Sequence, residues 1–181
     1  MRFKILIFIF LIISSKVFSQ FQAEMHTSGP SLGFSFLGST VQLGINHEYG
    51  INFKNDNQEI IGKFGIGGIF RAWSYTEDFP EVEWSYSNIL FGFQSNYHFK
   101  LKNEKLDPWA GLFIAYDFKE VNKEILVEGA DISNSEKGGL CVGAQAGMRY
   151  WLNTKMAFSV RLGIATLNYS ALDLGFDYSF K

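Results

Sequence analysis

Residues 171–181 read ALDLGFDYSFK and carry an apolar side chain at every second position. The apolar set comprises Leu172, Leu174, Phe176, Tyr178 and Phe180, and the intervening set comprises Ala171, Asp173, Gly175, Asp177 and Ser179. Successive side chains of a strand point to opposite faces, so this segment has one apolar wall and one polar, acidic wall. Such a pattern, rich in aromatic residues, is typical of a strand between lipid and a polar interior.

The same alternation recurs seven more times along the chain, and no helical periodicity follows residue 19. It predicts eight strands in all, at residues 31–36, 40–50, 59–75, 82–99, 107–121, 138–151, 155–167 and 171–181. Most of these segments reach the roughly 9–11 residues that cross a bilayer. Eight antiparallel strands in simple succession can close without a free edge. We therefore predict an all-β fold, an eight-stranded antiparallel up-and-down transmembrane β-barrel.

The amino terminus indicates export. A basic start at Arg2 and Lys4 precedes the apolar run 5–13, and Val17 and Ser19 supply an aliphatic and a small residue at the −3 and −1 positions of a cleavage site. This run is too short for a membrane-spanning helix, which needs about 20 residues, and is typical of a cleaved signal peptide. We predict a signal peptide at 1–19 and one barrel domain at 20–181.

Composition excludes several classes of function. The predicted mature chain has 13 basic and 18 acidic residues, and it has no basic cluster that would favour nucleic acid. Cys141 is the one cysteine, so no internal disulfide can form, and parity directs it inward. His26, His47 and His98 lie on separate segments without the spacing of metal ligands. We predict no metal site and no cofactor.

The polar walls of the predicted strands carry charges of both signs. We expect a lumen charge network made of Glu48, Lys63, Arg71, Asp117, Arg149, Arg161, Asp173 and Asp177. Eight strands enclose a space that side chains can fill, and buried charges persist when they are paired. The network is therefore predicted to plug the lumen rather than to line a pore. If the last hairpin turns near Tyr169, Arg161 lies opposite Asp177, and we expect these two residues to form an ion pair.

Acidic residues gather in the segments predicted as loops at one end. The members are Glu77, Asp78, Glu81, Glu124, Glu128 and Asp131. They favour solvated loops. The alternative is a cation-bridged contact with lipopolysaccharide, or a contact with a basic partner.

With this strand pattern, residues 31–181 resemble the small OmpA/OmpX-type outer-membrane barrels of Gram-negative bacteria. Members of that class commonly end in an aromatic residue that the barrel insertion machinery reads. The corresponding terminal strand signal here is Phe176, Tyr178 and Phe180, although Lys181 follows as the last residue. The resemblance implies that both termini lie in the periplasm. Segments 50–58, 100–106 and 152–154 would then be periplasmic turns, and 37–39, 76–81, 122–136 and 168–170 would face outward.

These observations predict a small, monomeric outer-membrane barrel without enzymatic activity. Its expected role is structural or surface interaction, in contact with outer-membrane lipid and lipopolysaccharide. Two alternatives stay open. One is an enzyme that modifies outer-leaflet lipid, for which we find no catalytic cluster. The other is a secreted, lipocalin-like carrier, in which the apolar walls would face inward.

Overall fold

The computed structural model of this protein describes residues 21–54, 57, 58, 60–127 and 138–181. The predicted signal peptide at 1–19 lies outside these residues, as do Glu128 and Asp131. Within the described residues, no helix is both long and apolar enough to cross a membrane.

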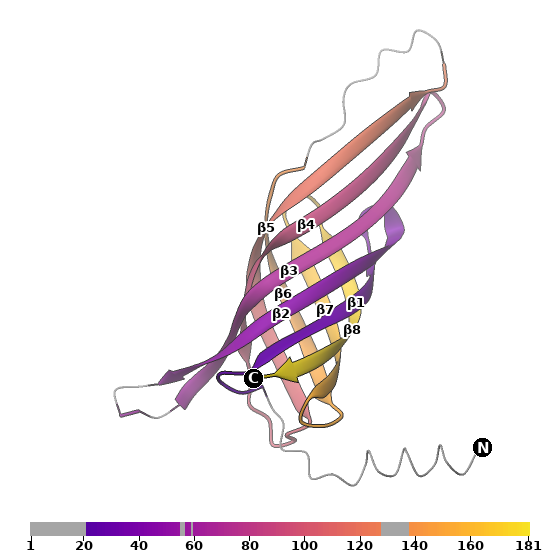
Figure 1. The fold of residues 1–181 in the computed structure, drawn as a ribbon. Coiled ribbons are helices and arrows are strands. Elements are labelled where there is room, and N and C mark those ends of the chain that lie inside the picture. Colours follow the sequence, from indigo (N-terminus) through magenta and orange to yellow (C-terminus); the bar gives the residue numbers. More distant parts are fainter. Residues whose placement is uncertain (1–20, 55–56, 59, 128–137) are drawn as a thin grey trace, which may run out of the picture.

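Eight antiparallel strands close into a barrel in sequence order, which confirms the predicted fold (Figure 1). The strands are β1 (His26–Ser35), β2 (Thr40–Lys54), β3 (Ile60–Asp78), β4 (Val82–His98), β5 (Leu106–Ile125), β6 (Leu140–Trp151), β7 (Met156–Ala165) and β8 (Ser170–Phe180). A short 3-10 turn, η1 (Leu37–Ser39), joins β1 to β2. The barrel closes where β1 pairs with β8, from His26 opposite Phe180 to Ser35 opposite Ala171. We call the end of the barrel that carries Phe21 and Lys181 the terminal end, and the opposite end the far end.

Side chains alternate between a buried lumen face and an exposed outer face. In β8, Leu174 is 63% exposed whereas Asp173 is 3% exposed, and in β4 the corresponding values are 68% for Phe93 and 4% for Gln94. Leaving one large apolar side chain in water forgoes about 1.5–3 kcal/mol, so a band of such residues requires an apolar surrounding. The lipocalin-like alternative is wrong, because a water-soluble carrier needs the opposite arrangement.

The strand boundaries differ from the prediction at several ends. β1 begins at His26 and continues through Gly29 and Pro30, although neither residue has a partner in the described β1–β8 ladder. Proline lacks a backbone N–H, which accounts for the missing bond at its own position. β2 continues to Lys54, through residues predicted as a turn.

The turn between β7 and β8 lies earlier than expected, and this changes the charge pairing. Leu167 and Asn168 occupy its centre, both with left-handed backbone angles. Arg161 consequently lies opposite Asp173, and Asp177 lies opposite Ala157. The predicted Arg161–Asp177 pair is wrong. The reason is that alternation constrains which face a residue takes but not the register, provided that the shift is an even number of residues.

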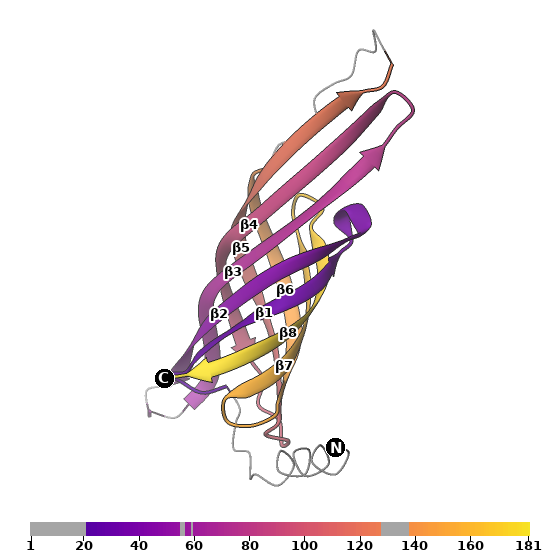
Figure 2. The ribbon, with the colours of Figure 1, turned by 45° about the vertical axis from the view of Figure 1, so that its right-hand side comes forward.

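Three strands continue beyond the barrel at the far end, as Figure 2 shows. β3 and β4 pair up to Asp78 opposite Glu83, and β4 and β5 pair up to Val82 opposite Ile125. The β2 ladder, in contrast, stops at Trp73. We call residues 74–78, 82–87 and 119–125 the protruding sheet. Three of the acidic residues predicted in loops, Glu77, Asp78 and Glu124, lie on these strands instead, and Glu81 lies in the turn between β3 and β4.

The outer face changes from apolar to polar at the same level on all three strands. Ala72, Ile89 and Phe118 lie side by side in one row. The next outward row is Ser74, Ser87 and Glu120, followed by Thr76, Ser85 and Asn122, and then by Asp78, Glu83 and Glu124. A common row marks one boundary of the apolar band, and the protruding sheet lies wholly beyond it.

Candidate functional site

The lumen is the candidate site, because the buried charged and polar side chains of the described chain gather there. Its side chains form layers along the barrel axis. An apolar group, Phe21, Met25, Trp151 and Ala157, fills the terminal end, and a second apolar cluster lies towards the far end. A hydrogen-bonded network of charges and amides lies between them.

Arg149 of β6 is the centre of this network. Its Nε donates to Asp177 Oδ2 at 2.6 Å, its Nη2 donates to Glu48, and its Nη1 lies 3.6 Å from Asp107 Oδ2. Glu48 also accepts a hydrogen bond from Asn96. Arg149 is 1% exposed and Glu48 is fully buried. A buried guanidinium with three carboxylates around it is a strongly compensated charge.

A second group is built around Arg71 of β3. Its Nε donates to Asp173 Oδ2 at 3.0 Å, and its Nη2 donates to Asn46 Oδ1 at 2.8 Å. Asp173 Oδ1 accepts from Gln42 Nε2 at 2.7 Å, and the same amide donates to the Tyr169 hydroxyl at 3.2 Å. Tyr169 lies outside the strands, and burial raises the pKa of its hydroxyl, which therefore stays neutral at physiological pH.

The other predicted network residues are placed differently from one another. Arg161 donates to Asn46, and its guanidinium lies 4.9 Å from the centre of the Trp109 ring. Lys63 donates from Nζ to the Phe21 carbonyl at 3.0 Å. Asp117 lies on the other side of the far-end apolar cluster, where Asn88 Nδ2 donates to both of its carboxylate oxygens at 2.9 and 3.1 Å.

The terminal end is closed by the segment that precedes β1. Phe21 is 1% exposed and stacks on His98 with ring centres 3.9 Å apart. His98 Nδ1 lies 2.8 Å from Asp107 Oδ1, and its Nε2 lies 3.7 Å from Glu48 Oε1. The Glu24 N–H donates to the Gly50 carbonyl, and the Gly50 N–H donates to the Met25 carbonyl, which ties the segment to β2.

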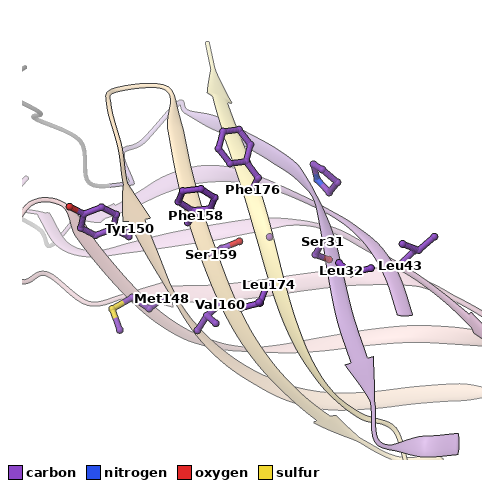
Figure 3. A pocket seen from close by; sticks show the side chains of 12 residues that line it. Ser31, Leu32, Leu43, Met148, Tyr150, Phe158, Ser159, Val160, Leu174 and Phe176 are labelled. Carbon is purple, nitrogen blue, oxygen red and sulfur yellow. The ribbon is translucent and has the colours of Figure 1, made fainter. Parts of the chain in front are cut away.

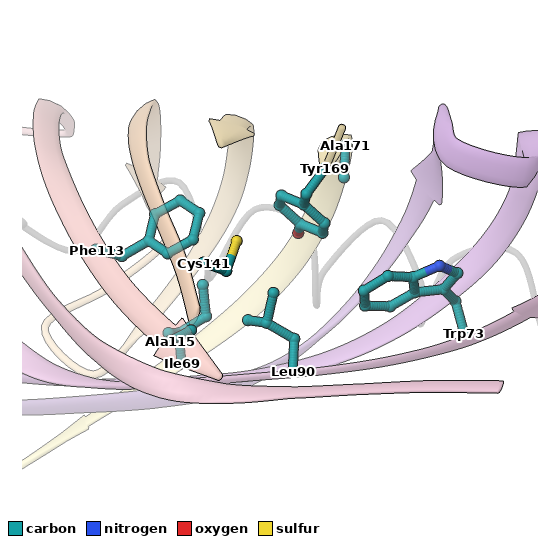
Figure 4. Packing of buried hydrophobic residues seen from close by; sticks show 8 residues of the cluster. All are labelled: Ile69, Trp73, Leu90, Phe113, Ala115, Cys141, Tyr169 and Ala171. Atoms are coloured by element: carbon teal, nitrogen blue, oxygen red, sulfur yellow. The ribbon is translucent and has the colours of Figure 1, made fainter. Parts of the chain in front are cut away.

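Figure 4 shows the apolar cluster towards the far end. Its members are Ile69, Trp73, Leu90, Phe113, Ala115, Cys141, Tyr169 and Ala171. Trp73 and Phe113 approach Tyr169 with ring centres at 5.6 and 6.1 Å. Apolar packing therefore fills part of the lumen, beside the predicted plug of polar and charged side chains.

The protruding sheet has two unlike faces. Its inner face buries Val82, Trp84 and Tyr86, against which Tyr75 and Val121 pack. Lys119 and Lys123 lie over the rings of Tyr86 and Trp84, at 5.5 and 5.6 Å from the ring centres. The outer face carries the polar rows that end in three carboxylates. Because these three carboxylates, Asp78, Glu83 and Glu124, stand on paired strands, the ladder rather than a loop determines their positions.

The outside of the barrel holds a shallow groove of about 810 Å³ across β2, β1, β8, β7 and β6 (Figure 3). Its walls are largely apolar and include Leu32, Leu43, Met148, Val160 and Leu174. The predicted terminal strand signal lies on this same outer face. Phe176 makes an edge contact with Phe158 at 5.4 Å, and Tyr178 and Phe180 are each 44% exposed. These exposed apolar and aromatic side chains can contact lipid.

Two candidate groups for covalent chemistry lie far apart in the lumen. Cys141 donates weakly from Sγ to the Thr166 carbonyl at 3.6 Å, and His98 lies between carboxylates at the terminal end. The contacts of the described residues place no serine or cysteine side chain on a nitrogen of His98. Among the same residues, no three His, Cys, Asp or Glu side chains are grouped as metal ligands.

Sequence reasoning missed several members of the network. Asp107 and His98 lie at the ends of predicted strands and were not included in the predicted charge network, although each has the parity of its inward neighbour, Asp117 or Asn96. Alternation alone assigns both to the inward face, but it does not show that they contact Glu48 and Arg149. Tyr169 has the parity of the inward residues Ala171 and Asp173, but it lies in a segment predicted as a turn, where alternation does not determine the direction of a side chain.

Comparison with known proteins identifies the fold. No family model and no curated protein matches this sequence. Among solved structures, the N-terminal β-barrel domain of Pseudomonas aeruginosa OprF is similar with a TM-score of 0.54 at 13% identity, covering 87% of this chain and 98% of that domain. A de novo designed transmembrane β-barrel gives 0.52 at 12% identity over 88% and 98% of the two chains. A second design, TMB2.3, gives 0.52 at 14% identity over 88% and 95%. The chain thus has the fold of eight-stranded transmembrane barrels.

Proposed function

We propose that this protein is a non-catalytic, monomeric outer-membrane barrel that carries the protruding sheet as a surface for interaction outside the membrane. The observation behind this proposal is the row at which three strands together exchange an apolar outer face for a polar one. A paired sheet keeps its side chains in fixed positions relative to one another, as a surface for interaction requires, whereas a loop does not. The barrel would then anchor the protruding sheet in the membrane.

The filled lumen supports a role other than conduction. Trp109, Trp151, Arg71 and Arg149 are all less than 2% exposed. Planar bilayers with the refolded protein should show no stepwise current above the bare membrane. Mass spectrometry of lipid A from cells with and without the protein should give identical species. Steady single-channel steps would contradict the closed lumen, and a new lipid A species would favour the enzyme.

The orientation can be tested by labelling intact cells. In a Cys141→Ala background, Ser85→Cys places a thiol on the outer face of the protruding sheet, and Thr154→Cys places one in the exposed turn between β6 and β7. A membrane-impermeant maleimide should label the first variant on intact cells and the second only after lysis. The reverse result would place the sheet in the periplasm.

Lipopolysaccharide is the partner that we propose for the outer acidic row. Asp78, Glu83 and Glu124 lie directly opposite one another across three strands, and like charges in such positions repel unless a cation lies between them. Calcium titrated into refolded protein in lipopolysaccharide micelles should bind more weakly when all three residues are changed to their amides. Glu104→Gln, in the turn between β4 and β5, is the control. Equal calcium heats for all three proteins would contradict this partner.

A further inference from the structure

Two histidines meet on the outer face of the barrel near its terminal end. His26 of β1 and His47 of β2 lie with Nδ1 of the first 3.4 Å from Nε2 of the second. Their ring centres are 5.4 Å apart, and both side chains are half-buried. They are separated by 20 intervening residues in the sequence, so only the β1–β2 register brings them together.

Neighbouring aromatic rings hold both imidazoles in place. His26 stacks on Phe180 of β8, with ring centres 5.4 Å apart and an angle of 8° between the ring planes. It also contacts Tyr49 at 4.8 Å. His47 lies 6.4 Å from Phe180. The strands beneath are paired through Thr27 opposite Glu48, so the imidazoles project from a rigid ladder rather than from a loop.

The separation of the two nitrogens matches a specific coordination geometry. Two nitrogens bound to Zn²⁺ at about 2.0–2.1 Å with a tetrahedral angle are about 3.3–3.4 Å apart. Two adjacent nitrogens in a square plane around a metal would lie closer, at about 2.9 Å. We propose that His26 Nδ1 and His47 Nε2 bind one Zn²⁺ ion, with solvent completing the tetrahedron.

Metal binding requires little rearrangement of this pair. Each ring must be neutral and carry its hydrogen on the nitrogen that points away from the metal, which replaces the shared hydrogen bond by two metal bonds. No third histidine, cysteine or carboxylate of the described residues joins the two rings. The site is therefore a half-buried, two-ligand site on the outer face, and its effect is to connect β1 to β2 beside the strand that closes the barrel.

Calorimetry on untagged, refolded protein in micelles tests this site. Zinc chloride should bind to the wild-type barrel with one ion per chain. His26→Gln and His47→Gln should each weaken this binding roughly tenfold or more, since loss of a direct ligand costs at least as much as loss of an outer-shell partner. Ser28→Gln, opposite His47 on the same outer face, is the matched control and should bind as the wild type does. Absence of zinc heat in the wild type, or undiminished binding in both histidine variants, overturns the proposal.

Nuclear magnetic resonance of the wild type gives a second measurement that needs no variant to fold. Long-range ¹⁵N–¹H spectra should show zinc shifting Nδ1 of His26 and Nε2 of His47 together. His98, which is 4% exposed in the lumen, serves as the internal control and should not move. Zinc shifts confined to one of the two outer-face rings, or shared equally by His98, would also overturn the proposal.

Discussion

At the scale of single residues, two buried arginines on neighbouring strands, Arg149 of β6 and Arg161 of β7, differ in how their charges are compensated. Arg149 contacts Glu48, Asp107 and Asp177, whereas Arg161 donates to the neutral amide of Asn46. Removing one partner of a buried ion pair leaves the other charge buried and unpaired, at a cost of about 3–5 kcal/mol. Removing a buried cation that has no bonded carboxylate leaves no such unpaired charge.

Arg149→Met should therefore lower the free energy of unfolding by about 3–5 kcal/mol, and Arg161→Met by much less. Both residues are buried arginines on neighbouring strands, so each is the control for the other. Urea unfolding of the refolded barrels in lipid vesicles measures the difference. Equal losses for the two variants would show that the carboxylates do not distinguish them.

Double-mutant cycles with Asp177→Asn test the pairing itself. We expect a coupling of about 1 kcal/mol or more between positions 149 and 177, because their side chains bond at 2.6 Å. Between positions 161 and 177 the coupling should be within about 0.5 kcal/mol of zero. A larger coupling for the second pair would restore the register that the sequence suggested.

At the scale of elements, the β7–β8 turn determines which charges face one another. The Tyr169 N–H donates to the Thr166 carbonyl at 3.4 Å, and the Ala165 N–H donates to the Tyr169 carbonyl at 2.8 Å. Leu167 and Asn168 between them have φ angles of 59° and 58°. Positive φ angles at both central residues are what a type I′ hairpin turn requires, and such turns favour Asn followed by Gly. Leucine is poorly suited to the left-handed region, and the tertiary pairing overrides that local preference.

Leu167→Asn should consequently stabilise the barrel by up to about 1 kcal/mol, since asparagine tolerates this backbone region better. Leu167→Ala is the matched control, because it shortens the side chain without relieving the backbone. Urea midpoints of the two variants in vesicles provide the measurement. If both variants shift the midpoint equally, backbone strain at this residue is not the cause.

The far ends of β3 and β5, residues 76–78 and 122–125, are the parts of the protruding sheet that sequence reasoning took for loops. Runs such as Thr76–Glu81 are polar and charged, and such runs usually indicate loops. Outside an apolar band, however, a strand can have water on its outer face and needs no apolar residues there. The pattern then becomes polar outside and aromatic inside, as Trp84 and Tyr86 show. A search for inverted alternation beyond each predicted strand could have found these extensions.

At the scale of the whole molecule, the apolar band and the protruding sheet predict where lipid meets the protein. In the Cys141→Ala background, Leu112→Cys places a probe on a side chain that is 66% exposed within the band, and Ser85→Cys places one beyond it. A fluorophore attached at the first position should be quenched by brominated lipid, and at the second by a water-soluble quencher. Lipid quenching at Ser85 would mean that the protruding sheet lies in the membrane or along its surface.

The sequence by itself determined the strand count, the barrel class and the face that each strand side chain takes. It could do so because the period of two is a local property of an extended chain, which any one segment displays without its neighbours. Only the tertiary structure decided the partners: Arg161 opposite Asp173 rather than Asp177, Tyr169 against Gln42, and His26 beside His47. Sliding one strand past another by an even number of residues keeps every face unchanged but exchanges every neighbour, so register depends on turns and packing that no single strand encodes.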